Sequence, residues 1–263
     1  MSDTRQIPAV SLRGGAQMPM VGFGTWPMRG HQAHAAVTAA LAAGYRHVDT
    51  ATMYGNEVAV GRALRDSGLD RGEVFITTKV RPTDAGRARS VLRTSLRALD
   101  TGFVDLWLVH WPPPQPRQCR MIWNEVLQVQ ADGLARSVGV SNHSLAQIDD
   151  LAAHSGHTPA VNQVRWSPMR HDARTLAGHR ERGVVLEGYS PLKYTDLGHP
   201  VLAVIASAHG VTSAQVVLRW HLEHEITVIP KSVDPARIAA NLDLFGFSLS
   251  PREVAEIDGL AAA

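Results

Sequence analysis

The stretch VFITTKVRPTDAGRARSVLRTSLRALDTGFVDLWLVH (residues 74–110) contains two short apolar runs on either side of one longer helical pattern. Residues 74–79 and 104–110 have the length and the apolar content of buried strands. The pattern between them forms one helical stripe, which consists of Val91, Leu92, Ser95, Leu96 and Leu99. Strand, helix and strand in this order predict two parallel strands joined by a crossover helix.

The same alternation continues along the whole chain. The expected strands are residues 20–24, 46–49, 74–79, 104–110, 135–141, 160–163, 184–190 and 226–231. Helical patterns separate them, as in HQAHAAVTAALAAG (31–44), where Gly44 supplies the stop. Eight such units in 263 residues match one (β/α)8 barrel, the TIM barrel, in both size and period.

Two segments lie outside this repeating pattern. AVSLRGGAQMPM (9–20) has two short extended pieces around Gly14 and Gly15, which predicts a β-hairpin that closes the bottom of the barrel. REVAEIDGL (252–260) predicts an extra C-terminal helix. No linker or low-complexity tract divides the chain, so residues 1–263 are expected to form a single domain.

Composition restricts the class of protein. A formal net charge of +2 is small for a protein that coats nucleic-acid phosphates. The single cysteine, Cys119, cannot form an internal disulfide, which fits a reducing compartment. The sequence has neither a signal-peptide pattern nor the roughly 18 uninterrupted apolar residues of a membrane span. We expect a cytoplasmic monomer whose partner is a small molecule, not nucleic acid or a membrane.

Ionisable residues follow three consecutive strands of the predicted barrel. The strands end in Asp49, Lys79 and His110, and Tyr54 lies on the loop after Asp49. Each residue alone has an ordinary structural explanation, such as a helix cap for Asp49 or a core position for His110. Adjacent strands lie about 4.8 Å apart, however, and the C-terminal ends of barrel strands carry the chemistry. Their joint placement therefore predicts a catalytic group.

These four residue types suit the reduction of a carbonyl. An ammonium favours a phenolate, so Lys79 should lower the pKa of Tyr54 from about 10 and make the phenol a proton donor. Asp49 should keep Lys79 charged, and His110 should orient a carbonyl oxygen. No side chain donates hydride, so the reaction requires a nicotinamide cofactor.

A cofactor site is expected at the remaining strand ends. GFG (22–24) begins like a G-x-G-x-x-G sequence, but position 27 is Pro, which excludes a Rossmann site. Lys231, Ser232 and Arg237 near the start of a helix suit a phosphate monoester such as the 2′-phosphate of NADP. Groups for a nicotinamide ring and its carboxamide follow other strands, at Ser141, Asn142, Gln163, Tyr189 and Ser190.

Six motifs across nearly the whole chain resemble one family. They are GYRHVDTATMYGNE (44–57), TTK (77–79), LVHWP (108–112), GVSN (139–142), GYSPL (188–192) and IPKS (229–232). In this order they are similar to the aldo-keto reductases, and most of all to short bacterial members such as the 2,5-diketo-D-gluconate reductases.

The resemblance implies NADPH-dependent reduction of an aldehyde or ketone. Tyr54 would be the proton donor, with its pKa lowered by Lys79 and Asp49, and His110 would orient the carbonyl. The implied contacts to NADPH are Thr25, Ser141, Asn142, Gln163, Tyr189, Ser190, Leu192, Ile229, Lys231, Ser232, Val233, Arg237 and Asn241. The substrate pocket is expected to be lined by Trp26, Met53 and Trp111, and no metal is expected.

Two departures from the family pattern affect these expectations. Ala240 precedes Asn241 where many relatives carry Glu, so one polar contact to the adenosine is missing and cofactor affinity should be weaker. The segment after GYSPLK is short and the chain ends soon after the last helical pattern, which leaves little material for substrate-covering loops. The pocket should therefore be open.

Other chemistries remain as alternatives. HQAH (31–34) and HLEH (221–224) have H-x-x-H spacing, but neither matches H-E-x-x-H and no third ligand is evident in the sequence. A barrel lyase could use Lys79 to form a Schiff base, but Asp49 would hold that amine protonated. A nucleotide sensor or structural protein with negligible turnover could retain the same site.

Overall fold

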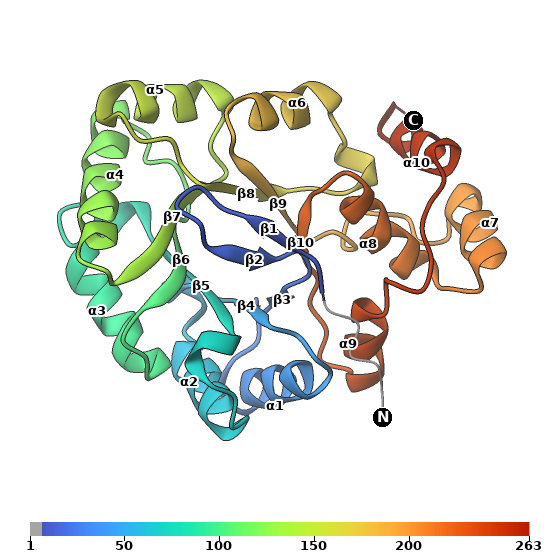
Figure 1. Cartoon of the computed structure of the whole chain (residues 1–263), viewed down its shortest axis with the longest axis horizontal. Coiled ribbons are helices and arrows are strands. Elements are labelled where there is room, and N and C mark those ends of the chain that lie inside the picture. The colour runs from blue at the N-terminus through green and yellow to red at the C-terminus, as the bar shows by residue number, and fades with distance from the viewer. Residues whose placement is uncertain (1–6, 263) are drawn as a thin grey trace.

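The computed structural model describes residues 7–262, and its parallel strands form a barrel inside a ring of helices (Figure 1). The eight strands, in the order in which they neighbour one another, are β3 (Phe23–Gly24), β4 (His47–Asp49), β5 (Phe75–Val80), β6 (Val104–Val109), β7 (Ala135–Ser141), β8 (Val161–Arg165), β9 (Val185–Tyr189) and β10 (Thr227–Ile229). A parallel bridge between Val21 and Val228 joins the first segment to the last. All eight predicted strands are confirmed, with ends that differ by a few residues.

The helices alternate with the strands and cover the outside of the barrel (Figure 1). They are α1 (Gly30–Ala42), α2 (Glu57–Asp66), α3 (Ala88–Leu99), α4 (Pro116–Ala131), α5 (Leu145–Ser155), α6 (Ala173–Glu181), α7 (Pro200–His209), α8 (Ser213–Glu223), α9 (Pro235–Leu242) and α10 (Pro251–Asp258). The stripe predicted for α3 is buried at Leu92, Leu96 and Leu99, whereas Val91 at its edge is only half-buried. The predicted extra C-terminal helix is α10, and the prediction is confirmed.

Alternation along each strand separates the core from the interior of the barrel. On β5, Ile76 and Val80 belong to the large apolar cluster between the strands and the helices. Phe75, Thr77 and Lys79 occupy the alternate positions and face the barrel interior, because successive side chains of a strand point to opposite faces. This alternation directs polar side chains inward near the C-terminal ends of the strands.

The predicted N-terminal hairpin is present and consists of β1 (Ala9–Ser11) and β2 (Gln17–Pro19), which pair antiparallel. Leu12 and Met18 are buried against apolar side chains of the barrel strands, namely Phe75, Leu106, Leu108, Ala160 and Val161. The hairpin lies across one opening of the barrel (Figure 1). The opposite opening, at the C-terminal ends of the strands, remains for a site.

No single helix among residues 7–262 is both long enough and apolar enough to cross a membrane. Only α7 and α8 taken together meet that test, and their axes bend by 89° at the break between them.

Candidate active site

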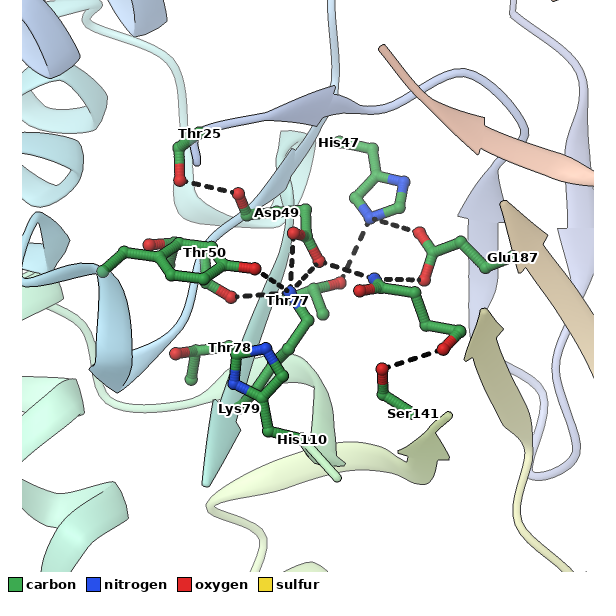
Figure 2. A network of polar contacts seen from close by, with 12 residues as sticks. Thr25, His47, Asp49, Thr50, Thr77, Thr78, Lys79, His110, Ser141 and Glu187 are labelled. Atoms are coloured by element: carbon green, nitrogen blue, oxygen red, sulfur yellow. Dashed lines mark hydrogen bonds and ion pairs between the residues drawn. The ribbon is translucent and has the colours of Figure 1, made fainter. Parts of the chain in front are cut away.

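The structure brings the four predicted catalytic side chains together at the C-terminal end of the barrel. Lys79 Nζ donates hydrogen bonds to both carboxylate oxygens of Asp49, at 2.6 and 2.7 Å, as Figure 2 shows. The same ammonium lies 3.4 Å from the Tyr54 hydroxyl oxygen. The rings of Tyr54 and His110 meet edge to face with centroids 5.7 Å apart. The phenol of Tyr54 therefore lies next to both the ammonium of Lys79 and the imidazole of His110.

Local structure fixes the loop that carries Tyr54. Tyr54 ends the 3-10 helix η1 (Thr52–Tyr54), and Gly55 then takes a left-handed φ of 63°. Asn56 is buried, accepts a 2.6 Å hydrogen bond from the Thr50 hydroxyl, and donates one of 3.0 Å to the Met28 carbonyl. The Tyr54 loop is therefore tied to the segment that follows β3.

The buried ion pair keeps Lys79 protonated. Burial by itself lowers the pKa of Lys79, but the attraction of Asp49, followed by that of Tyr54, outweighs burial and leaves the pKa raised. The Lys79 side chain is fully buried, so water screens this attraction little. A protonated amine cannot attack a carbonyl, which argues against a Schiff-base role for Lys79.

The pKa of Tyr54 differs from the sequence-based expectation. Burial raises the pKa of Tyr54, and this effect exceeds the lowering by Lys79, while Asp49 raises the pKa further. The expectation of a net lowering is therefore wrong for this structure, because the phenolate would be poorly solvated. The phenol is protonated at neutral pH, which is the form that a proton donor needs.

His110 is a neutral imidazole in this site. Burial, and then the charge of Lys79, lowers the pKa of His110 to about 3. Its Nδ1 is buried and has no hydrogen-bond partner within residues 7–262. A neutral imidazole beside the Tyr54 ring can donate a hydrogen bond to a carbonyl oxygen without bringing a second positive charge next to Lys79.

The residues predicted to hold the nicotinamide form a hydrogen-bonded network beside the ion pair. Gln163 Nε2 donates to Asp49 Oδ2 and to Glu187 Oε2, both at 2.8 Å. Hydrogen bonds also link the other members of the network. The Tyr189 hydroxyl donates to Asn142 Oδ1, and Asn142 Nδ2 donates to Ser141 Oγ. Ser141 Oγ in turn donates to the backbone carbonyl of Gln163.

Thr25 lies beside Asp49, since its hydroxyl donates a 2.9 Å hydrogen bond to the backbone carbonyl of Asp49 (Figure 2). Ser190 and Leu192 follow β9, where Ser190 has a left-handed φ of 55°. Ile229 is the last residue of β10 and is buried.

The residues predicted to bind the 2′-phosphate gather where the chain passes from β10 to α9. Lys231, Val233 and Arg237 are exposed, whereas Ser232 and Asn241 are buried. A carboxylate that the sequence analysis did not consider lies among them. Asp234 caps α9 by accepting a 3.0 Å hydrogen bond from the Arg237 backbone NH, and its other oxygen lies 3.8 Å from Arg237 Nε. This carboxylate opposes the binding of an anion.

The residues predicted to line the substrate pocket are exposed near the catalytic group. Trp26, Met53 and Trp111 are 53%, 47% and 44% exposed. The Trp26 ring lies 5.0 Å from the Tyr54 ring, centroid to centroid. Met53 precedes Tyr54 and Trp111 follows His110, so apolar side chains with accessible surface flank the predicted catalytic residues.

Two buried ionisable residues were missed by the sequence analysis. Glu187 and His47 lie inside the barrel, with Glu187 Oε1 3.6 Å from His47 Nε2 (Figure 2). Burial, and then the charge of Asp49, raises the pKa of Glu187 to about 8, whereas burial lowers that of His47 to about 4. Each stands two residues before a recognised site residue on the same strand, Asp49 or Tyr189. Residues two apart on a strand face the same side, so this spacing could have predicted that His47 and Glu187 point into the barrel.

Within residues 7–262, the two histidines of each H-x-x-H motif do not form a metal site together. His34 forms a 2.8 Å contact with Asp66 at the surface. His221 is buried, with its ring nitrogens on the backbone carbonyls of Val217 and Trp166.

Comparison with known proteins agrees with this architecture. A sequence model of the Aldo/keto reductase family matches residues 20–262. The chain belongs to this family. It is 42% identical over 258 residues to 2,5-diketo-D-gluconic acid reductase B of Corynebacterium sp. (strain SHS752001), covering 97% of this chain and 93% of that protein. It is 39% identical over 269 residues to morphine 6-dehydrogenase of Pseudomonas putida, covering 96% and 91%.

A solved aldo-keto reductase from Bombyx mori, in complex with NADP, has a TM-score of 0.91 at 30% identity, covering 97% of this chain and 93% of that one. The likeness of the six motifs to the aldo-keto reductases, including the 2,5-diketo-D-gluconate reductases, is confirmed. Family membership and these relatives support an oxidoreductase that reduces carbonyl groups.

Proposed function

We propose that this aldo-keto reductase uses NADPH to reduce an aldehyde or ketone to an alcohol, with Tyr54 as the proton donor. The observation that carries the proposal is the position of the Tyr54 hydroxyl, 3.4 Å from an ammonium that both oxygens of Asp49 hold. NADPH would supply the hydride that the side chains cannot provide. Every other requirement of the reaction falls to residues of this chain.

Four side chains of the site would carry out the remaining steps of the reduction. Tyr54 and His110 both direct hydrogen-bond donors at the carbonyl oxygen, which polarises the carbonyl. As the oxygen gains negative charge, it takes the Tyr54 proton and leaves a phenolate. The ammonium of Lys79 stabilises that phenolate, and this stabilisation is strong because the pair is shielded from water. Asp49 keeps Lys79 charged and in place throughout.

The chain also offers groups that fit NADPH. Both hydrogens of Gln163 Nε2 are donated within the protein, which leaves Oε1 as the acceptor for a carboxamide NH2. Tyr189 supplies an aromatic face, held by its bond to Asn142. Lys231 and Arg237 are two exposed cations against the one carboxylate of Asp234, so their balance favours a 2′-phosphate. The NADP complex of the Bombyx mori relative agrees with this choice.

We further propose that the enzyme works as a monomer in the cytoplasm on small carbonyl compounds. The free and buried thiol of Cys119 supports a reducing compartment. The exposed Trp26, Met53 and Trp111 support an open pocket that accepts apolar or aromatic substrates.

The proposal is tested by mixing the purified protein with NADPH and a panel of aldehydes and ketones, and following the loss of reduced-cofactor absorbance. We expect turnover with at least one carbonyl compound and a lower rate with NADH. NADPH binding without turnover across the panel would instead indicate a nucleotide sensor.

A further inference from the structure

Three side chains of types that can bind metal ions lie close together among the helices that surround the barrel. His171 directly follows the 3-10 helix η4 (Pro168–Arg170), His224 caps the C-terminal end of α8, and Asp258 is the last residue of α10. One ligand atom from each of the three residues lies within 4.8 Å of the other two. The three residues are far apart in the sequence, so only the fold unites them.

His171 is a nearly buried imidazole with no hydrogen bond within residues 7–262. Its side chain is 9% exposed, and its Nδ1 is buried without a partner. Its Nε2 lies 3.8 Å from Asp258 Oδ1, which is too long for a hydrogen bond. The nitrogen that faces Asp258 is Nε2, and a metal ion bound there would give Nε2 a partner, whereas Nδ1 would still have none within residues 7–262.

The distances are close to those of a tetrahedral zinc site. Ligand atoms about 2.05 Å from a tetrahedral Zn²⁺ lie about 3.3 Å from one another. His224 Nε2 lies 2.8 Å from Asp258 Oδ1, and His171 Nε2 lies 3.8 Å from the same oxygen. Each of these two distances would change by about half an ångström to admit the ion. The ligand nitrogens of His171 and His224 lie within 4.8 Å of each other, so they would approach by up to about 1.5 Å, with water as the fourth ligand.

The surroundings hold these ligands in place. Trp220 Nε1 donates a 2.7 Å hydrogen bond to Asp258 Oδ1, the kind of outer contact that orients a metal-binding carboxylate. The His171 ring stacks on His224 with centroids 4.9 Å apart and meets Trp220 edge to face. Arg180 contacts the same segment, but it donates to the His224 carbonyl rather than to the imidazole.

We propose that His171, His224 and Asp258 bind one divalent transition-metal ion, with zinc as the ion that two imidazoles and a carboxylate suit best. Magnesium and calcium prefer all-oxygen sites, which this set does not provide. A bound ion would fasten α10 to α8 and to the segment after β8. The site is separate from the tetrad, so the inference does not depend on the proposed reaction.

The test uses the full chain after treatment with a chelator. Isothermal titration with Zn²⁺ should give one ion per chain, and Zn²⁺ should raise the thermal unfolding temperature. Titration with Co²⁺, used as a probe, should give visible bands of tetrahedral coordination. Asp258→Asn keeps an acceptor for Trp220 but removes the charge. His171→Phe preserves an aromatic ring against Trp166 and Trp220, which both meet the His171 ring edge to face. Each should weaken Zn²⁺ binding at least about tenfold.

Asp66→Asn is the matched control, because Asp66 forms a 2.8 Å contact with His34 but has no third metal-binding group beside it among residues 7–262. It should leave Zn²⁺ affinity unchanged, and far-UV circular dichroism without metal establishes that each variant is folded. The chain has 13 histidines, so adventitious binding is a real outcome. Zn²⁺ affinity that is equal in the parent, Asp258→Asn and His171→Phe would overturn the proposal. So would the absence of tetrahedral Co²⁺ bands in the parent, whether or not the variants fold.

Discussion

The buried pair of Lys79 and Asp49 is the residue-scale feature on which the chemistry depends. Lys79→Met leaves the Asp49 carboxylate buried without its counter-charge, which should cost about 3–5 kcal/mol of unfolding free energy. Asp49→Asn in the Lys79→Met background removes that stranded charge and should recover part of the loss. Urea unfolding of the parent, the single variant and the double variant measures both effects. A double variant less stable than Lys79→Met would contradict the pairing.

A second feature of the site is the carboxyl group of Glu187, which is protonated at neutral pH because its pKa is raised to about 8. It faces the carboxylate of Asp49, the ammonium of Lys79 and the ring of His47, and it accepts a hydrogen bond from Gln163. Burial raises its pKa from 4.5 to about 8. The unfolded chain therefore ionises Glu187 at lower pH than the folded chain does, and the folded state binds the extra proton.

This difference makes stability fall as pH rises between the two pKa values. The contribution of Glu187 is fully present below the unfolded pKa of 4.5 and is lost as pH approaches about 8. Glu187→Gln keeps an uncharged group of the same shape and should remove this loss. We expect the unfolding free energy of the parent, relative to Glu187→Gln, to decrease from pH 5 to pH 8. Parallel pH profiles would show that Glu187 is ionised in the folded protein.

At the scale of elements, we propose that the start of α9 sets the preference for NADPH over NADH. Arg237→Ala removes one of the two cations expected at the 2′-phosphate, so the Kd for NADPH should rise far more than that for NADH. Asp234→Asn keeps the helix cap, because Asn caps as well as Asp, but removes the opposing charge. It should tighten NADPH and leave NADH unchanged. Fluorescence titration of both cofactors measures these effects, and equal changes for the two would refute the assignment.

The elements themselves were readable from the sequence, because their signals are local. Short apolar runs located every barrel strand, and helical patterns located α1, α3 and α10. The pairing of Glu187 with His47 was not readable. It depends on which inward-facing side chains meet across the barrel, where Gln163 and Glu187 are register partners on neighbouring strands. The Asp234 cap is different, because its signal is local: Asp is a preferred N-cap residue, and Asp234 directly precedes Pro235, the first residue of α9.

At the scale of the whole molecule, the closed barrel explains why distant motifs could be joined into one site. Asp49 and Tyr54 come from one β/α unit and Lys79 comes from the next. The barrel places the C-terminal ends of their strands at one opening, while the hairpin covers the other (Figure 1). That convergence follows from the fold, so recognising the barrel was enough to predict it. The meeting of His171, His224 and Asp258 was not predictable, because it depends on how outer helices pack rather than on the order of strands.

The most direct measurement of the central claim compares kcat of the parent with that of Tyr54→Phe, using NADPH and a carbonyl substrate found in the panel. Phe keeps the ring against Trp26 and His110 but has no proton to give, so kcat should fall about 10²- to 10⁴-fold. The Kd for NADPH, measured by fluorescence titration, should not change. A Tyr54→Phe protein that binds NADPH normally and retains the kcat of the parent would contradict the role of Tyr54 as the proton donor.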